Sequence, residues 1–401
     1  MSARPLRIVS VCRSLPTPEN ASEGIFVANR LAALAELCDL HVIQPVPYLP
    51  LVRPLPAWAR GPRRLNGLNI VHAPMRYVPG VLKSWDARWL ALAIRPVVER
   101  LHREQRIDLI DAHFGYPDGA GCARVGAALQ LPVFITLRGF ETEFMLRPRV
   151  GPQLIDAMRR ATGCVAVSHS LKALAVQGGV PEERVRVVQN AIDSSVFHLA
   201  DRSGARSALG VEPDVPLIVS VGHLVTRKRH HVLVDAFARL SQLWPTARLV
   251  IIGANSFETD YPRRLTARVN ELQLQDRVRL LGNVPARSVA TWLQAADVFA
   301  LATAREGCCN AVLEALATGL PVVTTPAGDN AWFVDGKTNG AIVPIDDAAA
   351  LAAALQASLS RRDWNRAEIS RRLLEQVGSW ARVAAAALSF MEERLRARMS
   401  V

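Results

Sequence analysis

The chain has 401 residues, half of them hydrophobic, which is too many for one ordinary core and favours two domains of similar size. The formal net charge is +12, but the excess arginine is spread along the chain without a zinc-finger or RNA-binding pattern, so no nucleic-acid partner is expected. The charge fits an anionic membrane surface, or arginine usage without a function. No apolar run reaches the roughly 18 residues of a membrane span, and the N-terminus lacks a signal-like core, which predicts a cytoplasmic protein. The six cysteines show no CxxC spacing and indicate buried free thiols, with no metal site.

The first half of the chain alternates apolar strand patterns with helical patterns. Helices are predicted at residues 25–37, 87–103 and 118–129. This βα order predicts an α/β fold with a parallel, doubly wound sheet, whose ligands bind beyond the carboxyl ends of the strands. The predicted strands are residues 7–12, 39–44, 68–72, 107–112, 132–137, 163–167 and 185–189.

Polar residues and glycines stand where a ligand would be bound in such a sheet. Gly24 precedes a helix, so its backbone could approach a phosphate or an acceptor closely, although an ordinary loop glycine would look the same. His113 directly follows a strand and has either a functional or a structural role. Arg138 and Gly139 follow the next strand, and Arg138 could hold an anion or pair with Glu141 or Glu143.

Residues 49–89 mix tryptophan, arginine and lysine with several prolines. Trp58, Trp85 and Trp89 could lie at headgroup depth in a membrane interface with cations above them. Equally, the tryptophans could pack beneath a long loop.

Residues 193–215 are irregular and polar and predict a linker between the domains. The alternation then restarts, with strands expected at residues 217–221, 248–253, 278–281, 297–301 and 321–325 and late helices at 348–359 and 380–399. A second doubly wound domain is therefore predicted. Its first strand ends in a turn with Gly222, His223, Arg227 and Lys228, whose cations could neutralise a diphosphate leaving group.

The stretch REGCCNAVLEALATGLP (residues 305–321) places Glu306 after a strand and Glu314 inside a predicted helix. Eight helical residues span about 12 Å, so both carboxylates could face one cleft. The helix would be opened by the backbone amides of Cys308, Cys309 and Asn310, where the dipole and free N–H groups suit a phosphate. The alternative is that both glutamates are simply solvated.

Taken together, these motifs resemble the retaining glycosyltransferases of family four (group 1), and within the family the teichuronic-acid and exopolysaccharide types. The resemblance rests on GIFVANRLAAL, DAHFGYPDG, TLRGFE, VSHSLKALAVQGGVPEERVRVVQNAID, VGHLVTRKRHHVLVDAF, the stretch from LLGNVPARS to EALATGLPVV, and DGKTNGAIVP. It implies the GT-B fold, two facing Rossmann-like domains with a cleft between them. The acceptor-side domain would be residues 1–192, the nucleotide-sugar domain residues 193–377, and a C-terminal helix at 378–401 would pack back toward the first domain.

The resemblance also implies roles for single residues. Glu306 would touch the donor's sugar, Glu314 the ribose hydroxyls, Lys228 the diphosphate and His113 the transferred sugar, while Gly24 would lie near the donor. Catalytic roles fall to His113, Glu306 and Lys228, and acceptor-side roles to Arg138 and Gly139. The remaining donor-binding positions are Gly222, His223, Arg227, Cys309, Asn310 and Ala311.

The sequence departs from the family pattern in three places. Gly222-His223 stands where Gly-Arg is frequent, so Arg227 would have to supply the missing cation. Cys308 and Cys309 follow the Glu-Gly, and Arg138 replaces a frequent histidine.

The expected activity is transfer of a sugar from a UDP- or GDP-sugar to a saccharide or polyprenyl-diphosphate-linked acceptor in cell-surface polysaccharide synthesis. The family likeness implies retention, with front-face attack and no cofactor or metal ion. Contact with an anionic membrane would make the enzyme peripheral on the inner face of the cell membrane. A sugar-nucleotide epimerase of similar fold and a non-enzymatic membrane-surface partner remain alternatives. A nicotinamide dehydrogenase is disfavoured because no GxGxxG follows the first strand.

Overall fold

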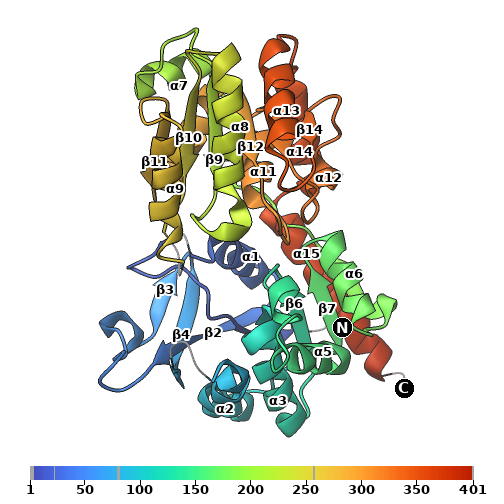
Figure 1. Cartoon of the computed structure of the whole chain (residues 1–401). Coiled ribbons are helices and arrows are strands. Elements are labelled where there is room, and N and C mark those ends of the chain that lie inside the picture. The colour runs from blue at the N-terminus through green and yellow to red at the C-terminus, as the bar shows by residue number, and fades with distance from the viewer. Residues whose placement is uncertain (1–3, 22, 79–81, 256–257, 400–401) are drawn as a thin grey trace. The chain divides into compact units, whose positions relative to one another are not determined.

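The computed structural model describes residues 4–399 except 22, 79–81 and 256–257. The chain forms two compact units (Figure 1). Unit 1 comprises Met1–Asn190 and Trp380–Val401, and unit 2 comprises Ala191–Ser379. Within the described ranges, every helix is too short or too polar to cross a bilayer.

The sheet of unit 1 has eight strands in the order β3-β4-β2-β1-β5-β6-β7-β8. All neighbours are parallel except β3, which pairs antiparallel with β4. The sequence predicted seven of these strands, and each is confirmed with shifts at its ends. The bounds are β1 (Arg7–Val11), β2 (Asp39–Tyr48), β3 (Arg63–Leu65), β4 (Leu68–Arg76), β5 (Leu109–His113), β6 (Val133–Leu137), β7 (Gly163–Ala166) and β8 (Val185–Val187).

The missed strand β3 is one arm of a tight hairpin. Asn66 and Gly67 form its two-residue turn, and both have positive φ. Asn-Gly is the preferred pair for such a turn, so the signal was present in the sequence.

The helices of unit 1 present apolar faces to the sheet. In α2, the buried residues Leu90, Ile94, Val98 and Leu101 recur at the spacing of one helical face. The last helix, α15, packs against α1 and β7, and the ring of its Phe390 lies 6.2 Å from that of Phe134. The bounds are α1 (Ile25–Ala35), α2 (Asp86–Glu104), α3 (Ala120–Leu129), α4 (Glu141–Phe144), α5 (Gly151–Arg160), α6 (His169–Gln177) and α15 (Trp380–Met399).

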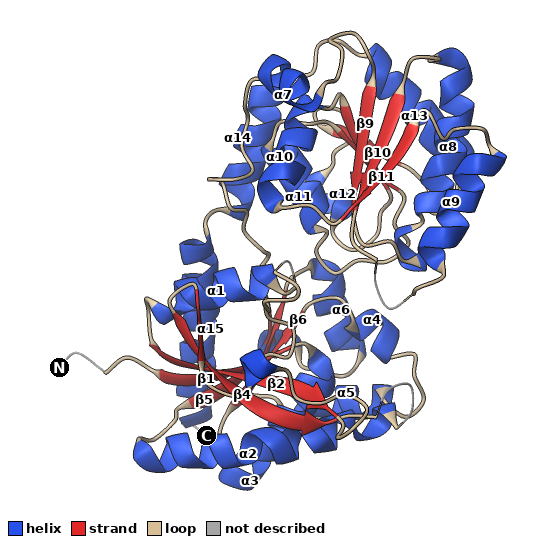
Figure 2. Ribbon diagram, turned by 90° about the vertical axis from the view of Figure 1, so that its left-hand side faces the viewer, coloured by secondary structure: helices blue, strands red, loops and turns tan. Residues whose placement is uncertain are grey.

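The sheet of unit 2 is wholly parallel, with the order β11-β10-β9-β12-β13-β14. Figure 2 shows α8 and α9 on one face and α7, α10 and α11 on the other. The order reverses between β9 and β12, as it does between β1 and β5 in unit 1, and ligands of open α/β sheets bind at such switch points. The bounds are β9 (Leu217–Val221), β10 (Arg248–Ile252), β11 (Val278–Gly282), β12 (Val298–Leu301), β13 (Val322–Thr324) and β14 (Gly340–Ile342).

The helices of unit 2 include one that the sequence analysis placed in a linker. Residues 193–215 contain α7, whose N-cap Asp201 accepts hydrogen bonds from the amides of Ser203 (3.0 Å) and Gly204 (2.9 Å). The prediction of an irregular linker is wrong for this helix. The bounds are α7 (Arg202–Leu209), α8 (His230–Leu243), α9 (Tyr261–Glu271), α10 (Ala286–Ala295), α11 (Asn310–Ala317), α12 (Asn330–Phe333), α13 (Ala348–Ser360) and α14 (Arg366–Val377).

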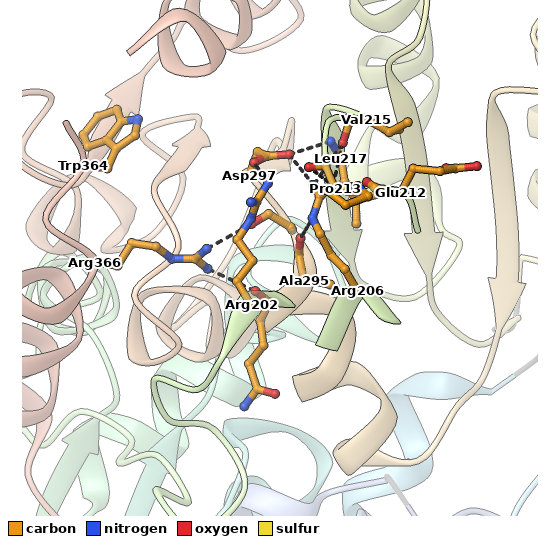
Figure 3. Close-up of polar contacts among 12 residues, drawn as sticks. Arg202, Arg206, Glu212, Pro213, Val215, Leu217, Ala295, Asp297, Trp364 and Arg366 are labelled. Atoms are coloured by element: carbon orange, nitrogen blue, oxygen red, sulfur yellow. Dashed lines mark hydrogen bonds and ion pairs between the residues drawn. The ribbon is translucent and has the colours of Figure 1, made fainter. Parts of the chain in front are cut away.

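One buried arginine attaches α7 to the rest of unit 2 (Figure 3). The guanidinium of Arg206 donates to Asp297 Oδ2 (2.7 Å), and Asp297 also accepts from Arg202 and from the amide of Leu217. This network holds α7 through polar contacts, in addition to its packing against α10. Arg206 further donates to the carbonyls of Ala295 (2.9 Å), Glu212 (2.6 Å), Pro213 (3.0 Å) and Val215 (2.9 Å).

Candidate functional site

A buried ion pair joins the two loops at the switch point of unit 2. Lys228 follows β9, Glu306 follows β12, and Lys228 Nζ lies 2.6 Å from Glu306 Oε1. Arg227 Nη1 lies 3.5 Å from Oε2, and the Thr303 hydroxyl donates to Oε1 at 2.8 Å. The side chains of Lys228 and Glu306 are only 9% and 7% exposed. The topology therefore brings two of the predicted site residues into direct contact.

The surroundings keep Glu306 ionised. Burial opposes the charge on its carboxylate, but Lys228 and Arg227 outweigh that effect and hold its pKa below the ordinary value. The carboxylate neutralises Lys228 in this state. An anionic ligand would have to replace Glu306 as the partner of Lys228.

The loop after β9 also contains Gly222 and His223. A Cβ atom at Gly222 would lie 3.2 Å from Cε and 3.3 Å from Cδ of Lys228, so the missing side chain leaves room for the lysine stem. His223 is exposed, and its pKa lies below the ordinary value because of lost hydration and the nearby charges of Lys228 and Arg227. A neutral imidazole therefore stands where the family pattern has a cation, beside Arg227.

Glu314 lies on α11 and is mostly buried. Burial raises its pKa to about 8, and only Lys228 opposes that shift. In the described part of the chain, its carboxyl group makes no hydrogen bond or ion pair. The alternative of two solvated glutamates is wrong, because Glu306 and Glu314 are both largely shielded from water.

The start of α11 differs from the predicted one. The helix begins at Asn310 with Cys309 as its N-cap, and no side chain caps it. Cys308 and Glu306 both precede the helix, so the estimated 12 Å along a helical axis does not describe the two glutamates. The backbone at Cys309, Asn310 and Ala311 still forms the positive end of the helix dipole.

Two positions beside Glu306 were missed by the sequence analysis. Thr303 fixes the carboxylate through its hydroxyl. Gly328 has φ +61°, and a Cβ atom there would lie 2.5 Å from the carbonyl oxygen of Gly307 and 3.0 Å from Cβ of Glu306. The available signal in the sequence was a glycine shortly after the predicted strand at residues 321–325.

In unit 1, the backbone at position 24 has a conformation and a close contact that require glycine. Gly24 is the N-cap of α1 with φ +62°, and a Cβ atom would lie 1.9 Å from the carbonyl oxygen of Ser14. The loop after β1 therefore touches the start of α1. No side chain caps this helix.

His113, Arg138 and Gly139 lie together at the carboxyl ends of β5 and β6. His113 is wholly buried, and its Nδ1 lies 3.1 Å from Nη2 of Arg138. Glu141 accepts the amides of Arg138 (3.1 Å) and Gly139 (2.7 Å), so its carboxylate holds the backbone rather than the guanidinium. The suggested pairing of the Arg138 side chain with Glu141 or Glu143 is thus not made.

The predicted site residues form two groups, one in each unit. Unit 1 holds His113, Arg138 and Gly139 at the carboxyl ends of β5 and β6, with Gly24 at the start of α1. Unit 2 holds the rest around the β9–β12 switch point: Gly222, His223, Arg227, Lys228, Glu306, Cys309, Asn310, Ala311 and Glu314.

Solved structures of similar shape include sucrose-phosphate synthase (tll1590) from Thermosynechococcus elongatus. It has a TM-score of 0.79 and 20% identity, and the match covers 98% of this chain and all of that one. Anabaena Alr3699/HepE in complex with UDP and glucose has a TM-score of 0.77 and 19% identity, covering 97% and 100%. The expected GT-B fold of two Rossmann-like domains is confirmed.

Sequence relatives extend over nearly the whole chain. TuaC of Bacillus subtilis (strain 168), a glycosyltransferase named for teichuronic acid biosynthesis, is 28% identical over 93% of this chain and 94% of its own length. WcaL of Escherichia coli (strain K12), named for colanic acid biosynthesis, is 28% identical over 74% of this chain and 72% of its own. The model of Glycosyltransferase Family 4 matches residues 24–196, and that of Glycosyl transferases group 1 matches residues 215–361. Because the two models together match most of its residues, the chain belongs to the group 1 glycosyltransferases of family four.

Proposed function

We propose that this glycosyltransferase moves a sugar from a UDP- or GDP-sugar to a saccharide or polyprenyl-diphosphate-linked acceptor in cell-surface polysaccharide synthesis. The names of TuaC and WcaL support a role in polysaccharide synthesis. The UDP bound by HepE supports a nucleotide-sugar as the donor. The single observation that carries the proposal is the Lys228–Glu306 pair at the switch point of unit 2. Unit 2 binds the donor, and unit 1 receives the acceptor.

Donor binding opens this ion pair. The diphosphate takes the place of Glu306 beside Lys228 and Arg227, and the start of α11 at Cys309, Asn310 and Ala311 adds its dipole. The released carboxylate of Glu306 then accepts hydrogen bonds from the sugar hydroxyls, and Glu314 accepts them from the ribose. Cations and dipole stabilise the negative charge that develops on the leaving diphosphate.

The sugar is transferred with retention. The acceptor hydroxyl attacks the anomeric carbon from the face that the diphosphate leaves, and a phosphate oxygen of the leaving group takes its proton. Lys228 and Arg227 supply the positive charge that a divalent ion would otherwise provide, so no metal ion or further cofactor is needed. Activity that persists with excess EDTA, and a product of unchanged anomeric configuration by NMR, are the expected results.

A membrane contact in unit 1 would deliver a lipid-linked acceptor to this cytoplasmic enzyme. Leu51 and Val52 are exposed at the tip of a tight turn, which is closed by two 2.8 Å hydrogen bonds between Leu49 and Arg53. Arg53 and Lys83 both lie over the ring of Tyr77. Apolar tips beside cations fit an anionic bilayer surface.

The tryptophans of residues 49–89 differ in their exposure and neighbours, and residues 79–81 lie outside the described residues. Trp58 packs against His72 and donates to Glu19, so it is a packing residue. Trp85 is exposed beside Arg88, and Trp89 lines a cavity of about 270 Å³. Sedimentation with phosphatidylglycerol vesicles should be lost in a Leu51→Ser/Val52→Ser variant, and equal binding to neutral vesicles would contradict the membrane proposal.

The donor proposal is tested with the purified full chain and a panel of UDP- and GDP-sugars. A true donor raises the melting temperature because it binds only the folded protein. With that donor, Glu306→Gln and Lys228→Met should each lower turnover about a hundredfold. Glu271→Gln, a surface carboxylate of unit 2, is the matched control and should keep full activity. Absence of any nucleotide binding by calorimetry would reject the proposal, and conversion of the donor without an acceptor would favour the epimerase.

A further inference from the structure

The ring of His113 is enclosed by protein groups on both of its nitrogens. Nε2 lies 3.1 Å from Oδ2 of Asp111, which is two residues earlier on the same face of β5. Nδ1 lies 3.3 Å from Nε and 3.1 Å from Nη2 of Arg138. Because the side chain is wholly buried, neither nitrogen is open to a substrate in this structure.

The partners of His113 fix its tautomer. Arginine has only donors, so Nδ1 must accept from Arg138 and the ring proton must lie on Nε2. Oδ2 of Asp111 lies 3.1 Å from Nε2 as a close polar contact, but the ring N–H is not aligned for a hydrogen bond to it. Burial lowers the pKa of His113 to about 4 against the opposing effect of Asp111, and Arg138 and Arg30 lower it further. The ring is therefore neutral at physiological pH. The ring lies between Asp111 and Arg138, so its fixed orientation determines the direction of the Arg138 guanidinium.

Asp111 is itself firmly held. Asp111 accepts hydrogen bonds from the hydroxyl of Ser10 at 3.1 Å and from the hydroxyl of Thr136 at 3.5 Å. The Thr136 hydroxyl in turn accepts a hydrogen bond from the wholly buried Arg30. Burial opposes the charge of Asp111, but His113 and Arg30 hold its pKa below the ordinary value. The carboxylate thus remains ionised and fixed in position. Asp111, His113 and Arg138 form a chain of contacts that we call the relay.

Arg138 is the outer member of this relay. Its side chain is half-buried at the carboxyl end of β6, and no described residue accepts a hydrogen bond from Nη1. Burial and Arg30 lower its pKa to about 10, which leaves it charged at neutral pH. The carboxylate of Glu141 is occupied by the backbone amides of Arg138, Gly139 and Gly115. A guanidinium that is fixed in direction and lacks a carboxylate partner suits a phosphate oxyanion.

We propose that Arg138 binds the phosphate group of the acceptor, while Asp111 and His113, rather than touching the transferred sugar, act as positioning residues for the guanidinium. This inference rests on the proposed transfer to a polyprenyl-diphosphate-linked acceptor. It assigns the two phosphate-bearing substrates to different cations, the donor to Lys228 and the acceptor to Arg138.

The test uses farnesyl diphosphate as a soluble probe and calorimetry on the full chain, with farnesol as the uncharged control. Arg138→Met and His113→Phe should each weaken farnesyl diphosphate about tenfold, as expected for loss of a charge-assisted contact. The double variant should bind no more weakly than Arg138→Met alone, because His113 acts only through Arg138. His113→Asn, whose amide oxygen can accept from Arg138, should recover most of the affinity. UDP affinity should be unchanged in all four variants.

Several results would overturn the inference. These are no binding of farnesyl diphosphate to the unaltered chain, equal binding of farnesol, or a loss of UDP affinity in Arg138→Met. So would a nitrogen-15 spectrum that places the His113 proton on Nδ1, a readout that needs no substrate. The separate UDP measurement with Lys228→Met tests the donor proposal by itself, so failure of one proposal can be told from failure of the other.

Discussion

Lys228 and Glu306 form a salt bridge of 2.6 Å between residues 78 positions apart, and both side chains are almost fully shielded from water. A buried pair of this kind loses much stability when one partner is removed, because the other charge is left without compensation. In the function proposed above, an anionic ligand replaces Glu306 beside Lys228, so the lysine keeps a counter-charge when the pair opens.

The first prediction concerns the stability of this pair without ligand. Lys228→Met and Glu306→Gln should each lower the free energy of unfolding by about 3 kcal/mol, and the double variant should lose clearly less than the sum. Urea unfolding followed by circular dichroism measures all four proteins. Additive losses would show that the two side chains do not interact in solution. Glu271→Gln removes an exposed carboxylate of α9 and should cost less than about 1 kcal/mol.

A second prediction follows from the pKa of Glu314, which burial raises to about 8 from an ordinary 4.5. The folded protein keeps a proton that the unfolded chain releases, so stability is full below about pH 4.5 and falls as the pH rises to about 8. Glu314→Gln removes this dependence. Melting temperatures of both proteins across that range should therefore diverge, with the variant more stable at alkaline pH.

The same shift predicts how the nucleotide binds. If an ionised Glu314 accepts the ribose hydroxyls, the affinity for UDP should rise as the pH passes through about 8. The Glu314→Gln variant should bind UDP weakly at every pH. Calorimetry in matched buffers measures the UDP affinity of both proteins at each pH. The same pH dependence of affinity in both proteins would count against a ribose contact.

The sequence predicted the elements that carry the site but not their order in the sheet. Apolar runs marked β9 and β12, and turn residues placed Lys228 and Glu306 just after them. Their contact depends on β9 and β12 being neighbours, which no local pattern states. Likewise, Asp111 lay inside a predicted strand and was not singled out, because the approach of Arg138 to His113 depends on the pairing of β5 with β6.

Some contacts could not be predicted from any sequence pattern. The acceptors of Arg206 are mostly backbone carbonyls, which every residue has, so the buried arginine looked like one more basic residue in a polar stretch. Gly24 was singled out for a close approach of its backbone to a ligand, and that contact stays a prediction. The group that lies against Gly24 in this structure is the carbonyl of Ser14.

A fourth prediction concerns Arg206. Arg206→Met should destabilise unit 2 by about 3 kcal/mol or more, because it removes a donor from four carbonyls and one of the three donors to Asp297. Arg202→Met is the matched control: its side chain is 38% exposed against 3% for Arg206, and its loss should stay below about 1 kcal/mol. Thermal unfolding measures both. Equal effects would mean that Arg206 holds α7 no more strongly than Arg202 does.

The last prediction isolates the position of Lys228 from its charge. In Gly222→Ala, the added methyl would lie 3.2 Å from Cε of Lys228, which is tighter than ordinary contact, so the flexible lysine stem should shift away from Glu306. We expect UDP affinity to fall about tenfold while the melting temperature changes little, since a misplaced charge-assisted contact loses much of its strength. Gly282→Ala provides no control, because its φ of +70° would strain the backbone. Gly61→Ala does, since a Cβ atom there meets nothing within 4 Å. Unchanged UDP affinity in Gly222→Ala would show that the lysine has room to reach the diphosphate by another path, and that this glycine is kept for the turn alone.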